Sequence, residues 1–234
     1  MSQKPDPHIS AEVKINLTIL VLGAMVMILN ETALSVALPT IMADFGIPAT
    51  SAQWLLTGFL LTMGVVIPTT GFLMDKFTTR QIFLASSGVF LAGTVLAALA
   101  PAFGVLLVGR VFQATGTALM IPTLMTVAMT LVPPQRRGSV MGIISVVISV
   151  APALGPTVGG FVLSMSSWHV IFWTMAPLLG LICAAGYFRL VNVGDKRDTP
   201  LDFPSVVLSV IAFGGLVYAV SSLENMLEGD GLVD

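Results

Sequence analysis

Long, continuous apolar runs constrain this chain more than any other feature of its sequence. A helix that crosses a bilayer needs about 20 mostly apolar residues, and several runs here are at least that long. Of the 234 residues, 56% are hydrophobic and only 9% are charged, against about 25% charged residues in ordinary soluble domains. The runs are continuous rather than alternating, which indicates helices and not the strands of a membrane barrel. We therefore expect an all-α integral membrane protein.

The order of the runs predicts the domain organisation. The first six form an expected N-terminal six-helix bundle at 1–190, because the loops between them are short enough to make consecutive helices antiparallel neighbours. The polar stretch 191–202 is expected to be a cytoplasmic linker, and 223–234 an extracellular tail. The expected spans, including one additional helix after the linker, are 15–38, 52–74, 81–100, 103–131, 139–164, 169–190 and 203–222.

The basic residues predict the orientation. Nine of the ten Lys and Arg residues precede the first run or lie in alternate connections between runs. The connections around 39–51, 100–102 and 165–168 contain none. By the positive-inside rule the basic loops are cytoplasmic, which places the N-terminus in the cytoplasm of a multi-pass protein, with the plasma membrane as the expected location.

Two normally charged residues, Glu31 and Arg110, fall inside spans. Charge at membrane depth is costly and often marks a transport pathway. Both lie roughly 10 Å below the outer surface at 1.5 Å rise per residue, so they could interact directly or through water. A nearby cation favours the ionised carboxyl and desolvation favours the neutral acid, which makes Glu31 a candidate for proton exchange. The alternative is a structural ion pair.

Asn30 and Gln113 flank this pair, with Gln113 one helical turn from Arg110. They are candidates for orienting the charges, for binding a substrate or for joining helices. Trp54 and Trp168 fall near the outer boundary, where interfacial anchoring is expected.

The sequence offers little to an enzyme or a metalloprotein. It contains no nucleophile–base set, no metal-ligand spacing and no phosphate-binding loop. The single cysteine, Cys183, allows no intrachain disulfide and is interpreted as a packed apolar thiol. We expect no enzymatic activity, no metal, no nucleic-acid partner and no cofactor other than a proton gradient.

Four segments carry a family resemblance, each on the helix or loop and the side that the charges independently assign. They are NETALSVALP at 30–39, GFLMDKFTTR at 71–80, RVFQATGTA at 110–118 and APALGPTVGG at 151–160. The four resemble signatures of the major facilitator superfamily, and the first resembles that of its fourteen-helix drug:proton antiporters. The first-helix signature usually has an aspartate where this chain has Asn30, with Glu31 beside it.

The resemblance implies proton-coupled efflux (antiport) of amphiphilic drugs or toxic compounds, by a chain that is the N-terminal half of a longer transporter. The implied partners are membrane lipid, protons, small amphiphilic substrates and a missing C-terminal half. Glu31 and Arg110 would couple protons with support from Asn30 and Gln113. The implied gating residues of the 71–80 loop are Gly71, Asp75, Lys76 and Arg80, and the implied antiporter residues of the 151–160 helix are Pro152, Gly155, Pro156, Gly159 and Gly160.

Two other interpretations stay open from the sequence. One is a facilitator that carries a single metabolite or lipid. The other is a seven-helix membrane protein that transports nothing, for which an external C-terminal tail is unusual.

Overall fold

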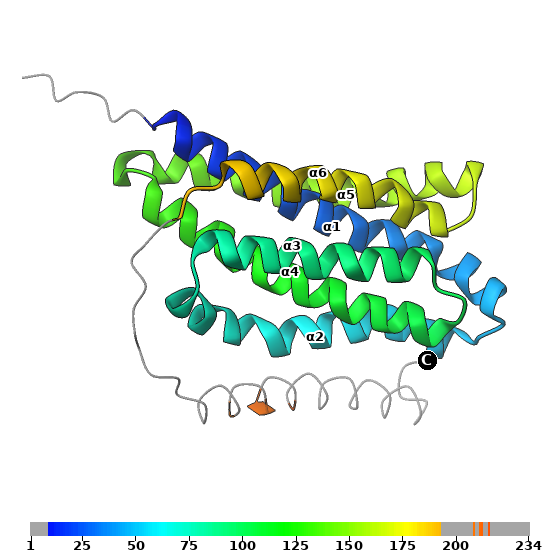
Figure 1. Ribbon diagram of the computed structural model, residues 1–234. Helices are drawn as coiled ribbons and strands as arrows, with labels where there is room; N and C mark the ends of the chain where they lie inside the picture. The colour runs from blue at the N-terminus through cyan, green and yellow to red at the C-terminus, as the bar shows by residue number, and fades with distance from the viewer. Residues whose placement is uncertain (1–8, 193–207, 209–210, 213–214, 216–234) are drawn as a thin grey trace, which may run out of the picture.

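Six α-helices form the protein (Figure 1) in the part of the chain that the computed structural model describes, residues 9–192 with positions 208, 211, 212 and 215. All six are long and apolar enough to cross a membrane, which confirms the all-helical membrane bundle. The expected seventh span, 203–222, lies outside the described residues apart from those four positions. So do the 223–234 tail and the linker after Asn192. The helices are α1 Ala11–Phe45, α2 Ala49–Lys76, α3 Thr79–Ala98, α4 Phe103–Leu131, α5 Pro134–Met165 and α6 His169–Arg189.

Capping residues set the helix ends, and they make α1 and α5 longer than their apolar runs predict. The Ser10 hydroxyl accepts the Val13 N–H at 3.3 Å at the start of α1. Gly46 ends the same helix with φ at 61°, a left-handed conformation that glycine adopts without steric cost. In α5 the first helical position is Pro134, where the missing N–H costs nothing. The span limits predicted from hydropathy therefore located the bilayer-sized cores of α1, α2 and α5 and missed their first and last turns, whereas the predicted limits 103–131 coincide with those of α4.

The helices pack as pairs around a central α1 and α4 (Figure 1). α3 packs along α4 most intimately, α1 along α5, α2 along α4 and α6 along α3. The close approach of α3 and α4 depends on glycine. A Cβ on Gly93 would lie 2.6 Å from the carbonyl oxygen of Gly109, and a Cβ on Gly116 would lie 2.7 Å from the carbonyl oxygen of Ser86. Small residues allow such backbone contact between membrane helices.

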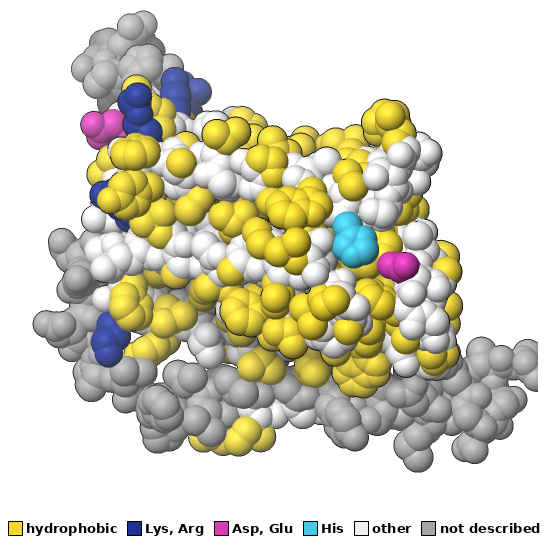
Figure 2. All heavy atoms as spheres, turned by 45° about the vertical axis from the view of Figure 1, so that its right-hand side comes forward, with side chains coloured by type: hydrophobic (Ala, Val, Ile, Leu, Met, Phe, Trp, Pro, Cys, Tyr) yellow, Lys and Arg dark blue, Asp and Glu magenta, His cyan; other side chains and the backbone are white. Residues whose placement is uncertain are grey.

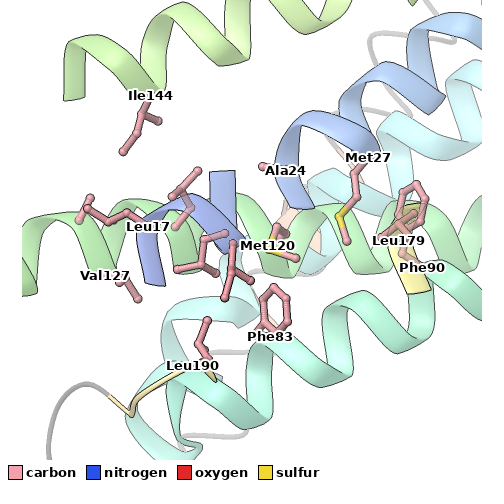
Figure 3. Close-up of a cluster of buried hydrophobic side chains, with 14 of the residues drawn as sticks. Leu17, Ala24, Met27, Phe83, Phe90, Met120, Val127, Ile144, Leu179 and Leu190 are labelled. Carbon is pink, nitrogen blue, oxygen red and sulfur yellow. The ribbon is translucent and has the colours of Figure 1, made fainter. Parts of the chain in front are cut away.

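Two separate apolar clusters fill the interior. The first, which we call the Met27 cluster, is drawn in Figure 3, with side chains contributed by α1, α3, α4, α5 and α6. The second, the Trp168 cluster, lies toward the opposite end of the bundle. The Met27 cluster includes Leu20, Met27, Phe83, Phe90, Met120, Leu124 and Leu179, and the Trp168 cluster includes Leu34, Ile41, Leu55, Ala97, Leu106, Trp168 and Phe172.

The basic residues gather at one end of the bundle. Lys14 near the start of α1, Lys76 at the end of α2, Arg136 at the start of α5 and Arg189 at the end of α6 share this end, because successive helices run in opposite directions. On the face shown in Figure 2 the Lys and Arg side chains lie toward this end, and apolar side chains cover the length beyond it. The arrangement is the one that the positive-inside pattern requires.

Trp168 does not anchor the protein at a membrane interface, and that prediction was wrong. Its side chain is 1% exposed, its Nε1 donates to Asp44 Oδ2 at 2.9 Å, and its ring packs against Phe45 at 5.6 Å. The polar edge of the indole is satisfied inside the protein by the end of α1, so the ring can be buried there. Trp54, by contrast, is 50% exposed. Cys183 is only partly buried on α6 rather than fully packed.

Candidate functional site

Arg110 of α4 is completely buried and is held by groups from two helices. Its Nε donates to the Leu55 carbonyl of α2 at 3.2 Å, and its Nη1 donates to Gln113 Oε1 at 3.1 Å. The guanidinium carbon lies 4.1 Å from the centroid of the Phe59 ring, where a cation is attracted to the face of the ring. A permanently charged group is thus fixed inside the bundle by a carbonyl, an amide and an aromatic ring.

Gln113 carries this network to two more helices. Its Nε2 donates to Asn30 Oδ1 of α1 at 3.0 Å and to Thr94 Oγ1 of α3 at 2.9 Å. The Thr94 hydroxyl in turn donates to the Phe90 carbonyl at 2.9 Å. We call the four buried side chains Asn30, Thr94, Arg110 and Gln113 the polar layer. With Leu55 of α2 it joins four helices.

The polar layer separates the two apolar clusters. Along α1 the Met27 cluster ends at Met27, Asn30 follows, and the Trp168 cluster begins at Ala33. The same order holds on α3, where Thr94 lies between Phe90 and Ala97. Sequence reasoning identified Asn30, Arg110 and Gln113 but missed Thr94, since one threonine in an apolar helix gives no signal of its own.

The hydrogen bonds in this layer have a fixed direction. Arginine can only donate, so Gln113 must present its oxygen to Arg110 and its NH₂ group to Asn30. Asn30 then accepts through Oδ1, which leaves its Nδ2 as a donor. Among the described residues, neither Asn30 Nδ2 nor Arg110 Nη2 has a hydrogen-bond partner.

Glu31 lies beside the polar layer but is not part of its hydrogen bonds. The carboxyl is half-buried and within Coulombic range of Arg110. Within residues 9–192 the structure shows no hydrogen bond or ion pair that joins the two. Successive residues of a helix point about 100° apart, so Asn30 faces the layer while Glu31 is turned away from it. The equal depth expected from the sequence brings the two charges near each other without direct contact.

Two glycines of the 151–160 segment bring α5 against α1 next to Glu31. A Cβ on Gly159 would lie 2.6 Å from the Ala33 carbonyl oxygen, and one on Gly155 would lie 2.7 Å from Thr32 Cβ. Gly160 has no atom of this kind within 4 Å, and Pro152 and Pro156 are exposed. The structure therefore brings two of the five predicted residues of this segment to α1.

The 71–80 segment lies at the basic end of the bundle, away from the polar layer. Its Arg80 donates through Nη2 to the Tyr187 carbonyl at the end of α6, and its backbone N–H donates to Asn192 Oδ1 at 3.3 Å. Thr78 caps α3 through a reciprocal pair with Gln81. Gly71, Asp75 and Lys76 are exposed on the last turns of α2.

No group of three or more His, Cys, Asp or Glu side chains in the described part of the chain is placed to hold a metal ion. An apolar groove of about 270 Å³ lies between α2 and α3, and Leu119 of α4 also lines it. It is lined by Leu73, Phe77 and Ile82 among others, at the basic end of the bundle and apart from the polar layer.

Comparison with known proteins places this chain among membrane transporters. Residues 20–224 match the sequence profile of the Major Facilitator Superfamily. The chain is 45% identical over 205 residues to the uncharacterized MFS-type transporter YcnB of Bacillus subtilis, covering 88% of this chain and 43% of the relative. It is 42% identical to the lincomycin resistance protein LmrB of the same organism, with 91% and 44% covered. It is 31% identical to a multidrug resistance protein B homolog of Mycobacterium tuberculosis, with 86% and 37% covered.

Solved structures share the fold at low sequence identity. The human organic anion transporter MFSD10 superposes with a TM-score of 0.69 at 17% identity, over 86% of this chain and 53% of that one. A peptide transporter POT crystallised with sulfate gives a TM-score of 0.70 at 16% identity, over 94% and 47%. The chain spans less than half the length of the curated relatives that it matches.

Proposed function

The chain belongs to the major facilitator superfamily, and on that premise we propose that it is the N-terminal half of a proton-coupled multidrug exporter. As a member of this family it is a multi-pass membrane protein. Relatives named for lincomycin resistance and multidrug resistance support a role in drug efflux. The proposed substrates are small amphiphilic compounds, which are exchanged for protons across the plasma membrane.

The observation that carries the proposal is the half-buried Glu31 beside the completely buried cation Arg110. A carboxyl placed between water and a buried cation can lose its proton when water reaches it and regain it when the site closes. Arg110 cannot move freely, because a carbonyl of α2 and an amide of its own helix hold it. In the proposed mechanism, Glu31 carries the proton and Arg110 stabilises the ionised carboxylate.

Glu31 is also placed where a change in its protonation can alter the packing of α1 against α5. It directly precedes Thr32 and Ala33, the residues against which Gly155 and Gly159 of α5 pack. In this proposal, α1 and α5 move relative to each other as access alternates between the two faces. The 71–80 segment gates the cytoplasmic side, where Arg80 ties the start of α3 to the end of α6.

The proposed orientation has the N-terminus in the cytoplasm. It is supported by the basic residues that gather at the end of the bundle where α1 begins, because positively charged loops remain cytoplasmic.

The test uses the full-length transporter in everted membrane vesicles. An imposed proton gradient should drive lincomycin uptake, and lincomycin should in turn release protons from the lumen. Glu31→Gln should abolish both fluxes while the protein remains in the membrane. The matched control is Glu12→Gln, which changes an exposed carboxyl in the first turn of the same helix and should leave both fluxes unchanged.

Drug-dependent proton exchange that survives Glu31→Gln would exclude this residue as the coupling site. A competition panel of unrelated amphiphilic compounds then measures breadth of substrate choice. Competition by one compound class alone would contradict the multidrug assignment and favour a carrier for a single metabolite or lipid.

A further inference from the structure

The polar layer has more donors than it can satisfy, and both unpartnered atoms belong to completely buried side chains. These atoms are Arg110 Nη2 and Asn30 Nδ2. A buried donor without an acceptor is costly, and more so when it belongs to a charged group. Both side chains bond to the same carboxamide, that of Gln113, so the two unpartnered donors lie at one level of the bundle.

Exchanging the oxygen and nitrogen positions of the Gln113 or Asn30 side-chain amide does not remove the surplus of donors. If Gln113 were turned, its NH₂ group would face the guanidinium, and both are donors. If Asn30 were turned, its NH₂ group would face the NH₂ group of Gln113. Every assignment that keeps the observed contacts therefore leaves donors in excess, which means that the layer lacks an acceptor.

The charge of the layer specifies which kind of acceptor fits. Arg110 brings one positive charge, and the other members, Asn30, Thr94 and Gln113, are neutral. A buried charge is stable when a group of opposite sign both pairs with it and fills its remaining hydrogen bonds. Carboxylate-type oxyanions meet both conditions, because they carry a negative charge and their two oxygens can each accept from a separate donor.

We propose that Arg110 Nη2 and Asn30 Nδ2 form a receptor for one carboxylate-type oxyanion. Asn30 can contribute to this receptor because its amide NH₂ group is a hydrogen-bond donor. An acidic side chain at the same position would have no such donor and would itself supply the negative charge. The proposal deepens the proposed function, because the receptor lies at the residues to which proton coupling is assigned.

Two sources can supply the oxyanion, and they share this chemistry. One is the Glu31 carboxylate, which is adjacent in sequence, half-buried and within Coulombic range of Arg110. It would enter the receptor when ionised and leave when protonated. The other is an acidic group on a transported compound, which would make anionic or zwitterionic amphiphiles the selected substrates.

The experiment measures the thermal unfolding midpoint of the purified full-length protein in lipid nanodiscs, with sodium acetate or neutral acetamide at equal ionic strength. If Glu31 is the source, Glu31→Ala lowers the midpoint and acetate restores it while acetamide does not. If a transported acid is the source, acetate raises the midpoint of the unmodified protein as well. The matched control, Glu12→Ala on the exposed first turn of α1, should respond to each of the two probes as the unmodified protein does.

Asn30→Asp tests the receptor itself at nearly constant side-chain volume. It removes the Nδ2 donor and gives Arg110 a carboxylate within the layer, so the response to acetate should disappear whichever source applies. The receptor is overturned if acetate and acetamide act alike on both the unmodified protein and Glu31→Ala, or if Asn30→Asp keeps the acetate response.

An infrared measurement keeps the proposal testable if Glu31→Ala does not fold. The carboxylate band of Glu31 is isolated as the difference between the unmodified protein and Glu31→Gln. A Glu31 seated in the receptor predicts that this band shifts in the Asn30→Asp background. An unshifted band, with no acetate response in the unmodified protein, overturns the receptor.

These readouts do not depend on transport. A protein that responds to acetate as expected but shows no proton-driven lincomycin uptake would refute the proposed function and leave the receptor standing. Proton-driven lincomycin uptake without the expected response to acetate would refute the receptor and leave the proposed function standing.

Discussion

Gln113 joins the polar layer through both ends of its carboxamide. Its oxygen accepts from Arg110, and its nitrogen donates to Asn30 and Thr94. The sequence marks Arg110 and Gln113 because they are strongly polar residues in an apolar run. It does not reveal which of Asn30 and Glu31 faces them, because a rotation of about 100° between neighbours depends on how α1 packs. Thr94 could not be identified at all, since a span threonine usually bonds its own helix.

Replacing Gln113 with leucine should destabilise the protein strongly. The change introduces an apolar side chain of similar size and leaves Arg110 Nη1 and Asn30 Oδ1 buried without the partners they have in Gln113. We expect a loss of about 3 kcal/mol in the free energy of unfolding, because lost bonds to charged groups cost most. Denaturant titration of the purified protein measures it. Thr115→Val on the same helix is the control, since that hydroxyl is exposed and bonds only the Val111 carbonyl, and an equal loss there would contradict the prediction.

Trp168→Phe should have a smaller but measurable effect. The variant keeps an aromatic ring in the Trp168 cluster and removes the bond from Nε1 to Asp44. Asp44 is exposed and can turn to water, so we expect a loss of about 1–2 kcal/mol. The comparison is Trp54→Phe at a half-exposed position, which should be nearly neutral in the same unfolding measurement. A neutral Trp168→Phe would show that the indole N–H does not hold α1 to α6.

At the scale of the elements, hydropathy predicted the existence and order of the six described helices, because a bilayer-sized apolar run leaves few alternatives. It did not predict how closely the helices approach. The glycines of α5 are alike in the sequence, yet Gly159 packs against the backbone of α1 and Gly160 has open space. Which face of α5 meets α1 depends on the packing of the whole bundle.

Gly159→Ala and Gly160→Ala should therefore differ sharply. A methyl group at position 159 would lie 2.6 Å from the Ala33 carbonyl oxygen and must push the two helices apart, at a cost of about 1–3 kcal/mol. At position 160 alanine meets nothing within 4 Å and should be neutral or stabilising by up to about 1 kcal/mol, because alanine favours the helix. Thermal unfolding of the two variants side by side tests this. Indistinguishable unfolding midpoints would contradict the close packing of α5 against α1 at Gly159.

At the scale of the whole molecule, α2 and α5 have the smallest buried fraction among the six described helices. Only 17% of the apolar core of each is buried, against 50% for α1 and 56% for α4. The relatives are more than twice as long as the matched part of the chain, and in the proposed full-length transporter a second half would cover these surfaces. Hydropathy alone could not distinguish a face that meets lipid from one that meets protein, because both are apolar.

A pair of spin-label positions tests which surfaces meet lipid in the full-length protein. With Cys183 replaced by serine, Val146→Cys on α5 and Leu181→Cys on α6 place labels at residues that are 61% and 70% exposed in this chain. We expect collisions with oxygen, which dissolves in lipid, to be frequent at position 181 and clearly fewer at position 146. Equal collision rates would mean that the exposed face of α5 is a lipid-facing surface.

The separation of the two apolar clusters by the polar layer sorts mutations into two kinds. Apolar contacts are non-directional, so exchanges of similar volume within either cluster cost less than about 1.5 kcal/mol. The four polar side chains are joined in one order of donors and acceptors, which the loss of the Gln113 carboxamide or of the Arg110 guanidinium would break. Such an interior can therefore change its apolar packing on both sides while its middle depends on a few directional bonds.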